Sequence, residues 1–94
     1  MKMVKTKKDY ILRTIVGENI LVPVGETALS FNGIITLNDT GVFLWECLRK
    51  EISASELLAE LVNEFDVEPE LARLDIQEFL DDALRFGLVE ITTE

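Results

Sequence analysis

The spacing of apolar residues changes once along this 94-residue chain, and that change limits the folds open to it. Before Asn38, short runs rich in β-branched and aromatic residues alternate with turn residues, which is typical of β-strands. After Asn38, apolar residues recur every three to four positions, the period of a helix that is buried on one side. The sequence therefore predicts an α+β domain in which a sheet precedes the helices.

Three strands are expected before position 38. Residues 10–16 and 19–24 flank the short turn Gly17-Glu18 and together predict a β-hairpin. Pro23 cannot donate a ladder hydrogen bond, so it should lie at a strand end or on a free edge. Asn-Gly at positions 32–33 separates the apolar runs ALSF and IITL, which is a strong hairpin signal. Residues 33–37 are therefore the third expected strand, with residues 28–31 as a candidate partner.

Capping residues mark the start of the first two expected helices. Asn38 or Asp39 can cap a mostly apolar helix that runs to about Arg49. Ser53 and Glu56 have the S-x-x-E spacing of a capping box, which predicts the start of a second helix there.

The third expected helix lies between a proline and a glycine. Pro69 suits the first turn of a helix, and Gly87 suits the left-handed residue that ends one. Residues 88–91 then form a short extension that can pack as a wing-like strand. A three-stranded antiparallel sheet followed by three helices outlines a winged helix-turn-helix fold.

Charge is distributed unevenly along the chain, which has 9 basic and 18 acidic residues and a formal net charge of −9. Five basic residues lie near the start: Lys2, Lys5, Lys7, Lys8 and Arg13. We predict that residues 1–9 are a solvated basic tail and that residues 10–94 are the folded domain. The alternative is that this tail helps to hold a partner protein. The acidic balance argues against a phosphate-binding surface.

The composition excludes several classes of site. The chain has no histidine, so it has no Ser–His or Cys–His catalytic pair and no imidazole metal ligand. Its one cysteine, Cys47, excludes an internal disulfide and suits the reducing cytoplasm, where we expect the protein to be. No uncharged run approaches the roughly 20 residues that span a bilayer. We therefore expect no enzyme, no cofactor and no membrane contact.

The uncharged strand at residues 33–37 is the most informative candidate site. Sheet edges are normally guarded by charge, proline or a bulge, and this segment has neither charge nor proline. Either the edge is harmlessly short, or the chain's own tail covers it, or it docks another chain by strand addition. By contrast, the adjacent carboxylates Asp81 and Asp82 point about 100° apart on a helix, which favours a solvated face over an acid–base pair.

Three segments resemble the PqqD family: VPVG at residues 22–25, FNGIITLNDTGVFLWECL at residues 31–48, and the final RFGLVE. The resemblance covers roughly residues 10–89. It implies a small, non-catalytic winged-helix domain that is a recognition element for ribosomally made, post-translationally modified peptides. Such a domain binds the leader of a precursor peptide and presents it to a modifying enzyme, often a radical S-adenosylmethionine enzyme.

The resemblance also implies where the leader lies, as an extra strand on the third strand and in a groove beside the last helix. Transferred to this sequence, it implies these peptide-binding residues: Phe31, Asn32, Gly33, Ile34, Ile35, Thr36, Leu37, Arg73, Ile76, Gln77, Leu80, Asp81 and Leu84. The acidic last helix favours a leader that carries Lys or Arg. Members that serve pyrroloquinoline quinone synthesis commonly have a shorter stretch before the Leu-Asn pair, which favours another precursor here.

Two other functions fit the same outline. A winged-helix DNA-binding protein needs a basic recognition helix, and the third helix is acidic instead. A small structural subunit that only stabilises a larger enzyme is the second alternative. The oligomeric state expected for any of these is a monomer or a weak homodimer, because an open strand edge can also pair with its own copy.

Overall fold

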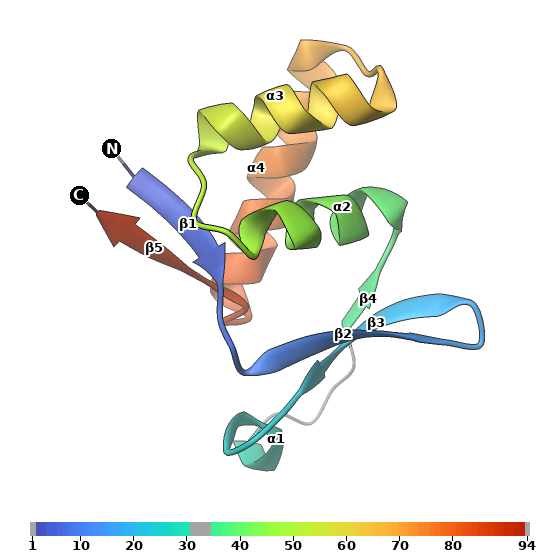
Figure 1. Cartoon of the computed structure of the whole chain (residues 1–94), viewed down its shortest axis with the longest axis vertical. Helices are drawn as coiled ribbons and strands as arrows, with labels where there is room; N and C mark the ends of the chain where they lie inside the picture. Colours follow the sequence, from blue (N-terminus) through green and yellow to red (C-terminus); the bar gives the residue numbers. More distant parts are fainter. Residues whose placement is uncertain (1, 31–34, 94) are drawn as a thin grey trace.

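A computed structural model describes residues 2–30 and 35–93 and confirms the predicted α+β class (Figure 1). The elements along the chain are β1 (Lys2–Thr6), β2 (Tyr10–Ile15), β3 (Glu18–Pro23), α1 (Thr27–Ser30), β4 (Ile35–Leu37), α2 (Asp39–Leu48), α3 (Ala54–Phe65), α4 (Pro69–Arg85) and β5 (Val89–Thr93). The three-stranded antiparallel sheet and the three helices that follow it have the predicted order.

A tight turn joins β2 and β3 into the predicted hairpin. Ile15 pairs with Glu18, so the two-residue loop is Val16-Gly17, one residue earlier than expected. Both loop residues have positive φ, 49° at Val16 and 78° at Gly17, as a type I′ turn requires. A β-branched residue is rare in this region, and the Val16 side chain is 97% exposed, so no packing compensates for its strain.

The sheet has the strand order β2-β3-β4, with both pairings antiparallel. Leu12 lies opposite Leu21, and Leu21 lies opposite Ile35, so the three side chains share one face of the sheet. Leu21 is completely buried on that face. Pro23 is the last residue of β3, where its missing N–H is tolerated as predicted.

The helices begin and end at the residues that the sequence indicates. The Asn38 side chain accepts the Gly41 N–H at 2.8 Å and caps α2. Ser53 and Glu56 form the expected capping box at the start of α3. Pro69 is the first residue of α4, and Gly87 follows that helix with φ 71°.

The hydrophobic core lies where α2 packs between the sheet and the other two long helices (Figure 1). Its fully buried side chains include Leu21 from the sheet, Leu44 and Leu48 from α2, and Leu57 and Ala72 from α3 and α4.

The basic start of the chain is not a free tail. β1 pairs antiparallel with β5, so the two ends of the chain lie side by side (Figure 1). Val4 is buried in the core, and it exchanges backbone hydrogen bonds of 2.8 and 3.0 Å with Ile52. The expectation of a solvated tail is therefore wrong for residues 2–6. The wing-like strand expected after α4 is confirmed as β5.

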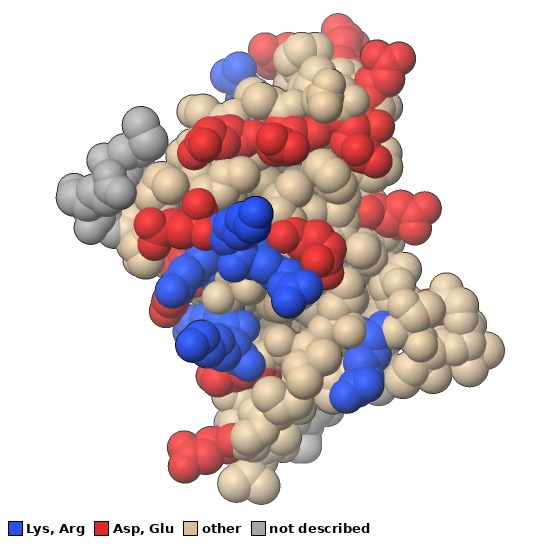
Figure 2. All heavy atoms as spheres, viewed as in Figure 1, with Lys and Arg blue, Asp and Glu red and all other residues tan. Residues whose placement is uncertain are grey.

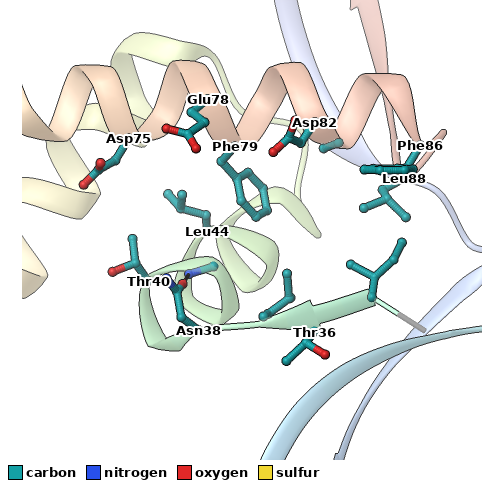
Figure 3. Close-up of a pocket in the computed structure, with 14 residues that line it drawn as sticks. Thr36, Asn38, Thr40, Leu44, Asp75, Glu78, Phe79, Asp82, Phe86 and Leu88 are labelled. Atoms are coloured by element: carbon teal, nitrogen blue, oxygen red, sulfur yellow. Dashed lines mark hydrogen bonds between the residues drawn. The ribbon is translucent and has the colours of Figure 1, made fainter. Parts of the chain in front are cut away.

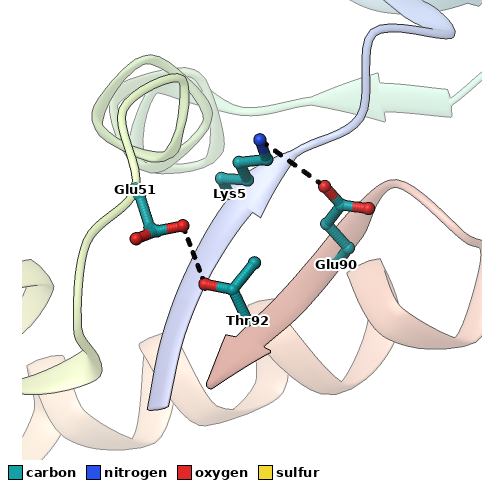
Figure 4. Close-up of polar contacts among 4 residues, drawn as sticks. All are labelled: Lys5, Glu51, Glu90 and Thr92. Carbon is teal, nitrogen blue, oxygen red and sulfur yellow. Dashed lines mark hydrogen bonds and ion pairs between the residues drawn. The ribbon is translucent and has the colours of Figure 1, made fainter. Parts of the chain in front are cut away.

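Side-chain contacts link the two strands of this ribbon to each other and to the segment between α2 and α3. Lys5 and Glu90 are cross-strand neighbours whose charged groups lie 3.7 Å apart, and the Thr92 hydroxyl donates to Glu51 at 2.8 Å (Figure 4). Both contacts are exposed, so they contribute little to stability compared with the burial of Val4.

Residues 27–30 form one helical turn, α1, where the sequence favoured a strand. The turn forms because Gly25, with φ 65°, reverses the chain, and its carbonyl accepts the Ala28 N–H at 3.2 Å. The Thr27 hydroxyl also donates to Asp9 at 2.9 Å. The remaining residue of that expected strand, Phe31, lies outside the described residues, as do Asn32, Gly33 and Ile34.

Candidate functional site

The position of β4 at the edge of the sheet leaves one side of this strand without a partner strand in the described part of the chain. The ladder shows which of its backbone groups point that way. Val24 donates its N–H to the Asp9 carbonyl at 2.8 Å, so these two residues are a hydrogen-bonded pair. Hydrogen-bonded and non-bonded pairs alternate along an antiparallel ladder. On β3, Asn19 and Leu21 therefore direct their N–H and C=O groups toward β4.

The same alternation fixes the orientation of β4. Leu37 and Ile35, which lie opposite Asn19 and Leu21, bond inward to β3. Thr36 lies between them, so its N–H and C=O point away from β3, and its side chain is exposed. Thr36 thus offers one donor and one acceptor to an incoming strand.

A groove of about 640 Å³ adjoins this edge, between β4 and the start of α2 on one side and α4 on the other (Figure 3). Its lining residues are Ile35, Thr36, Leu37, Asn38, Thr40, Gly41, Leu44, Asp75, Glu78, Phe79, Asp82, Ala83, Phe86 and Leu88. The groove holds a strand-forming edge and an apolar surface next to each other, which is the geometry that β-addition uses.

The inner part of the groove is apolar. Phe79 projects from α4 toward Leu44 of α2, and Leu88 lies beyond the end of α4 (Figure 3). Leu44 and Leu88 are buried core residues, whereas Phe79 is only half-buried. Phe79 and Phe86, which also lines the groove and is 45% exposed, are therefore the aromatic side chains that can gain buried surface when a ligand enters.

Carboxylates form the α4 rim of the groove. Asp75, Glu78 and Asp82 follow one another at i, i+3 and i+7, which places them along one side of the helix (Figure 3). Asp82 bonds Arg85 at 3.1 Å, while neither Asp75 nor Glu78 has a Lys or Arg nitrogen within 4.0 Å among the described residues. The rim therefore favours an occupant that carries positive charge.

The structure brings together only part of the residue set implied by the family resemblance. Ile35, Thr36 and Leu37 line the groove, whereas Phe31 to Ile34 lie outside the described residues. None of the six α4 residues lines it: Arg73, Ile76, Gln77, Leu80, Asp81 and Leu84.

These six side chains have other positions. Ile76 is 4% exposed in the core, and Leu80 packs partly buried against the same core. Gln77 donates to Asp81 at 3.0 Å on the solvent side of α4. Arg73 and Leu84 are exposed. The groove is lined instead by the neighbouring side of α4. The i, i+3, i+7 spacing of Asp75, Glu78 and Asp82 is the feature of the sequence that could have identified this side.

The described residues that line the groove form no metal-binding cluster. The described residues contain no group of three or more Cys, Asp or Glu side chains that could hold a metal ion. Burial, together with the nearby carboxylates of Glu60, Glu46 and Glu64, raises the pKa of the Cys47 thiol, which lowers the fraction of reactive thiolate at neutral pH. No described helix has the length and apolarity needed to cross a bilayer.

Fold and groove together define a winged-helix domain with an open strand edge beside an apolar, acid-rimmed groove. The chain belongs to the PqqD family, since the family model described as coenzyme PQQ synthesis protein D matches residues 18–89. No curated protein sequence matches the chain significantly.

Two solved structures have the same fold. One is TbiB1 in complex with the TbiA(beta) leader peptide, at 20% identity and a TM-score of 0.72, covering 92% of this chain and 94% of that one. The other is lasso peptide synthetase B1 complexed with the leader peptide, at 18% identity and a TM-score of 0.71, covering 93% of this chain and 96% of that one.

Proposed function

We propose that this protein binds the leader segment of a ribosomally made precursor peptide and presents the peptide to a modifying enzyme. The leader adds as a strand to the free edge of β4, and its side chains enter the groove beside α4. The protein itself performs no chemistry. The observation that carries the proposal is the outward-facing backbone of Thr36 next to the groove.

Edge and groove have complementary tasks in this binding mode. Backbone hydrogen bonds to β4 give affinity that depends little on the leader's sequence, because every non-proline residue carries the same donor and acceptor. Side chains on alternate positions of an added strand point to one face, so every second leader residue can face Phe79 and Phe86 in the groove. The carboxylates Asp75 and Glu78 then select for Lys or Arg at the groove rim.

Family membership and the solved relatives support the peptide as ligand. Both similar structures are complexes with leader peptides, and this chain covers more than nine-tenths of each. The modifying enzyme that we infer is of the radical S-adenosylmethionine type, which is a common partner in this family. The segment between β3 and β4 is longer than the stretch common in members that serve pyrroloquinoline quinone synthesis, so we infer a precursor other than that of the quinone.

A proline at the outward position of β4 tests the strand-addition mode. Thr36→Pro removes the outward N–H and places a ring where the added strand must lie, without breaking a bond to β3. We expect this variant to bind the leader at least about tenfold more weakly, a loss of about 1.4 kcal/mol. Calorimetry with the leader of a precursor peptide encoded beside this gene measures the effect.

The other edge of the same sheet supplies a matched control. Thr14 of β2 is also an exposed threonine, and the alternation of the ladder directs its N–H away from β3 as well. Thr14→Pro should keep full affinity for the leader. Full affinity in a folded Thr36→Pro variant, or an equal loss in Thr14→Pro, would contradict strand addition at β4.

A further inference from the structure

A second hollow of about 700 Å³ lies beside α2 and shares no lining residue with the groove. It is formed by the chain from the end of β1 to the middle of β2, together with α2 and β5. Trp45 and Arg49 line it from α2, whereas Leu44 of the same helix lines the groove. We call this hollow the basic pocket, after Lys5, Lys7, Lys8 and Arg49.

The basic pocket is positively charged, whereas the molecule as a whole is negatively charged. Four basic and three acidic side chains line it, although the chain as a whole carries a net charge of −9. Figure 2 shows most of the Lys and Arg side chains on this face gathered into one cluster, while Asp and Glu cover the helices above.

The three carboxylates of the basic pocket already have partners. Glu90 pairs with Lys5 at 3.7 Å, Glu46 pairs with Arg49 at 3.2 Å, and Asp9 accepts the Thr27 hydroxyl at 2.9 Å. Within residues 2–30 and 35–93, no carboxylate lies within 4.0 Å of the ammonium group of Lys7 or Lys8. These two cations are therefore available to an external anion.

The walls behind the cations are apolar. Tyr10 and Trp45 are nearly completely buried, and Ile11, at 40% exposed, is the apolar lining residue with the most accessible surface. An inorganic anion would use the cations but not this surface. A peptide segment with carboxylates around one apolar side chain uses both.

We propose that the basic pocket docks an acidic segment of a partner protein. The clustered positive charge is confined to the pocket, which favours a short protein segment over a nucleic acid or an anionic membrane as the ligand. Those polyanions extend well beyond the pocket, and the exposed α3 carboxylates Glu56, Glu60 and Glu64 would repel them. A short acidic segment needs only the pocket, because screening confines its attraction to about 8 Å at physiological salt. The partner and a peptide in the groove can then be bound at the same time.

The single tryptophan makes the pocket directly observable. Trp45 lines the basic pocket, so its fluorescence reports occupancy there. The probe is a capped peptide of Asp and Glu residues around one Phe, and its counterpart has Asn and Gln instead. We expect saturable binding of the acidic peptide, no binding of the amide peptide, and a loss of affinity as salt rises to about 1 M.

Charge reversal locates the binding. Lys8→Glu should weaken the acidic peptide by about fivefold, and so should Lys7→Glu, because each puts a carboxylate beside the bound one. Arg13→Glu makes the same change at an exposed β2 residue outside the pocket and should have an effect below about twofold. Leader binding to the groove should be unchanged in all three variants, which separates this proposal from the function proposed above.

Three results would overturn the proposal. One is the absence of saturation at about 1 mM acidic peptide, the weak end of specific binding. Another is an equal effect of Lys8→Glu and Arg13→Glu. The third is tighter, Lys8-dependent binding of a DNA duplex or of phosphatidylserine vesicles, which would assign the pocket to another class of partner.

Discussion

Reversing one charge on the groove rim tests whether the carboxylates of α4 attract the leader. Asp75 is exposed on the rim, so the substitution Asp75→Lys should leave the fold intact. In water, two unit charges about 6 Å apart interact by about 0.7 kcal/mol. The substitution changes the charge by two units, so the binding free energy of a nearby leader cation changes by about 1.4 kcal/mol before screening. A screening length of about 8 Å roughly halves this to about 0.7 kcal/mol, which is about a threefold loss of affinity.

Asp81 provides the matched control on the same helix. It is also an exposed aspartate, but it accepts a hydrogen bond from Gln77 on the solvent side and does not line the groove. It lies about 9 Å from Asp75 along the helix axis, beyond the screening length. Stopped-flow association with the leader at low and high salt should show slower binding for Asp75→Lys, a small effect for Asp81→Lys, and convergence near 1 M. Equal rates for the two variants at low salt would refute the reasoning.

Three other substitutions or modifications test the fold and the cysteine. Trp45→Ala should lower the free energy of unfolding by about 3–5 kcal/mol, because the ring is 97% buried, and an unchanged denaturation midpoint would contradict its place in the core. Val16→Asn should raise the melting temperature, since asparagine tolerates positive φ far better than valine in a type I′ turn; an unchanged or lower value would argue against that turn. Alkylation of Cys47 should be slow at neutral pH, because its pKa is raised and the thiolate forms only at higher pH. As the pH rises, its alkylation rate should keep increasing beyond the pH at which the rate of an ordinary thiol becomes constant. A rate that becomes constant at the same pH as that of a free cysteine would contradict this.

Local signals were sufficient to predict the helices. The Asn38 cap, the capping box at Ser53 and the first-turn Pro69 each depend on residues at most four positions apart. Such contacts can be inferred from spacing alone. The β2–β3 hairpin is local in the same sense, and only its turn was shifted by one residue.

The first strand could not be predicted because its partner lies at the other end of the chain. β1 has one buried apolar side chain, Val4, among lysines, and this composition is also typical of a solvated tail. It becomes a strand because β5 supplies the backbone partners and Ile52 closes the other side. Nothing within residues 1–9 encodes either contact.

The sequence alone does not determine which side of α4 faces the groove. Apolar residues occur on several sides of this helix, so their period does not select one face. The aliphatic side chain of Ile76 was assigned to the groove, but the core needs it. Phe79 and the rim carboxylates then occupy the adjacent side. Only the packing of α4 against α2 and α3 decides this rotation.

The groove and the basic pocket are both lined by residues of α2. Asn38 sets where the helix begins, and the rotation of about 100° per residue then sets the side on which each later residue lies relative to that first turn. Gly41 and Leu44 then face the groove, and Trp45, about 100° further round, faces the basic pocket. A bound leader and a bound acidic segment would thus lie on two different sides of the same helix, about 100° apart. The arrangement allows the protein to hold a peptide and a second protein at once, which is what presenting a substrate to an enzyme requires.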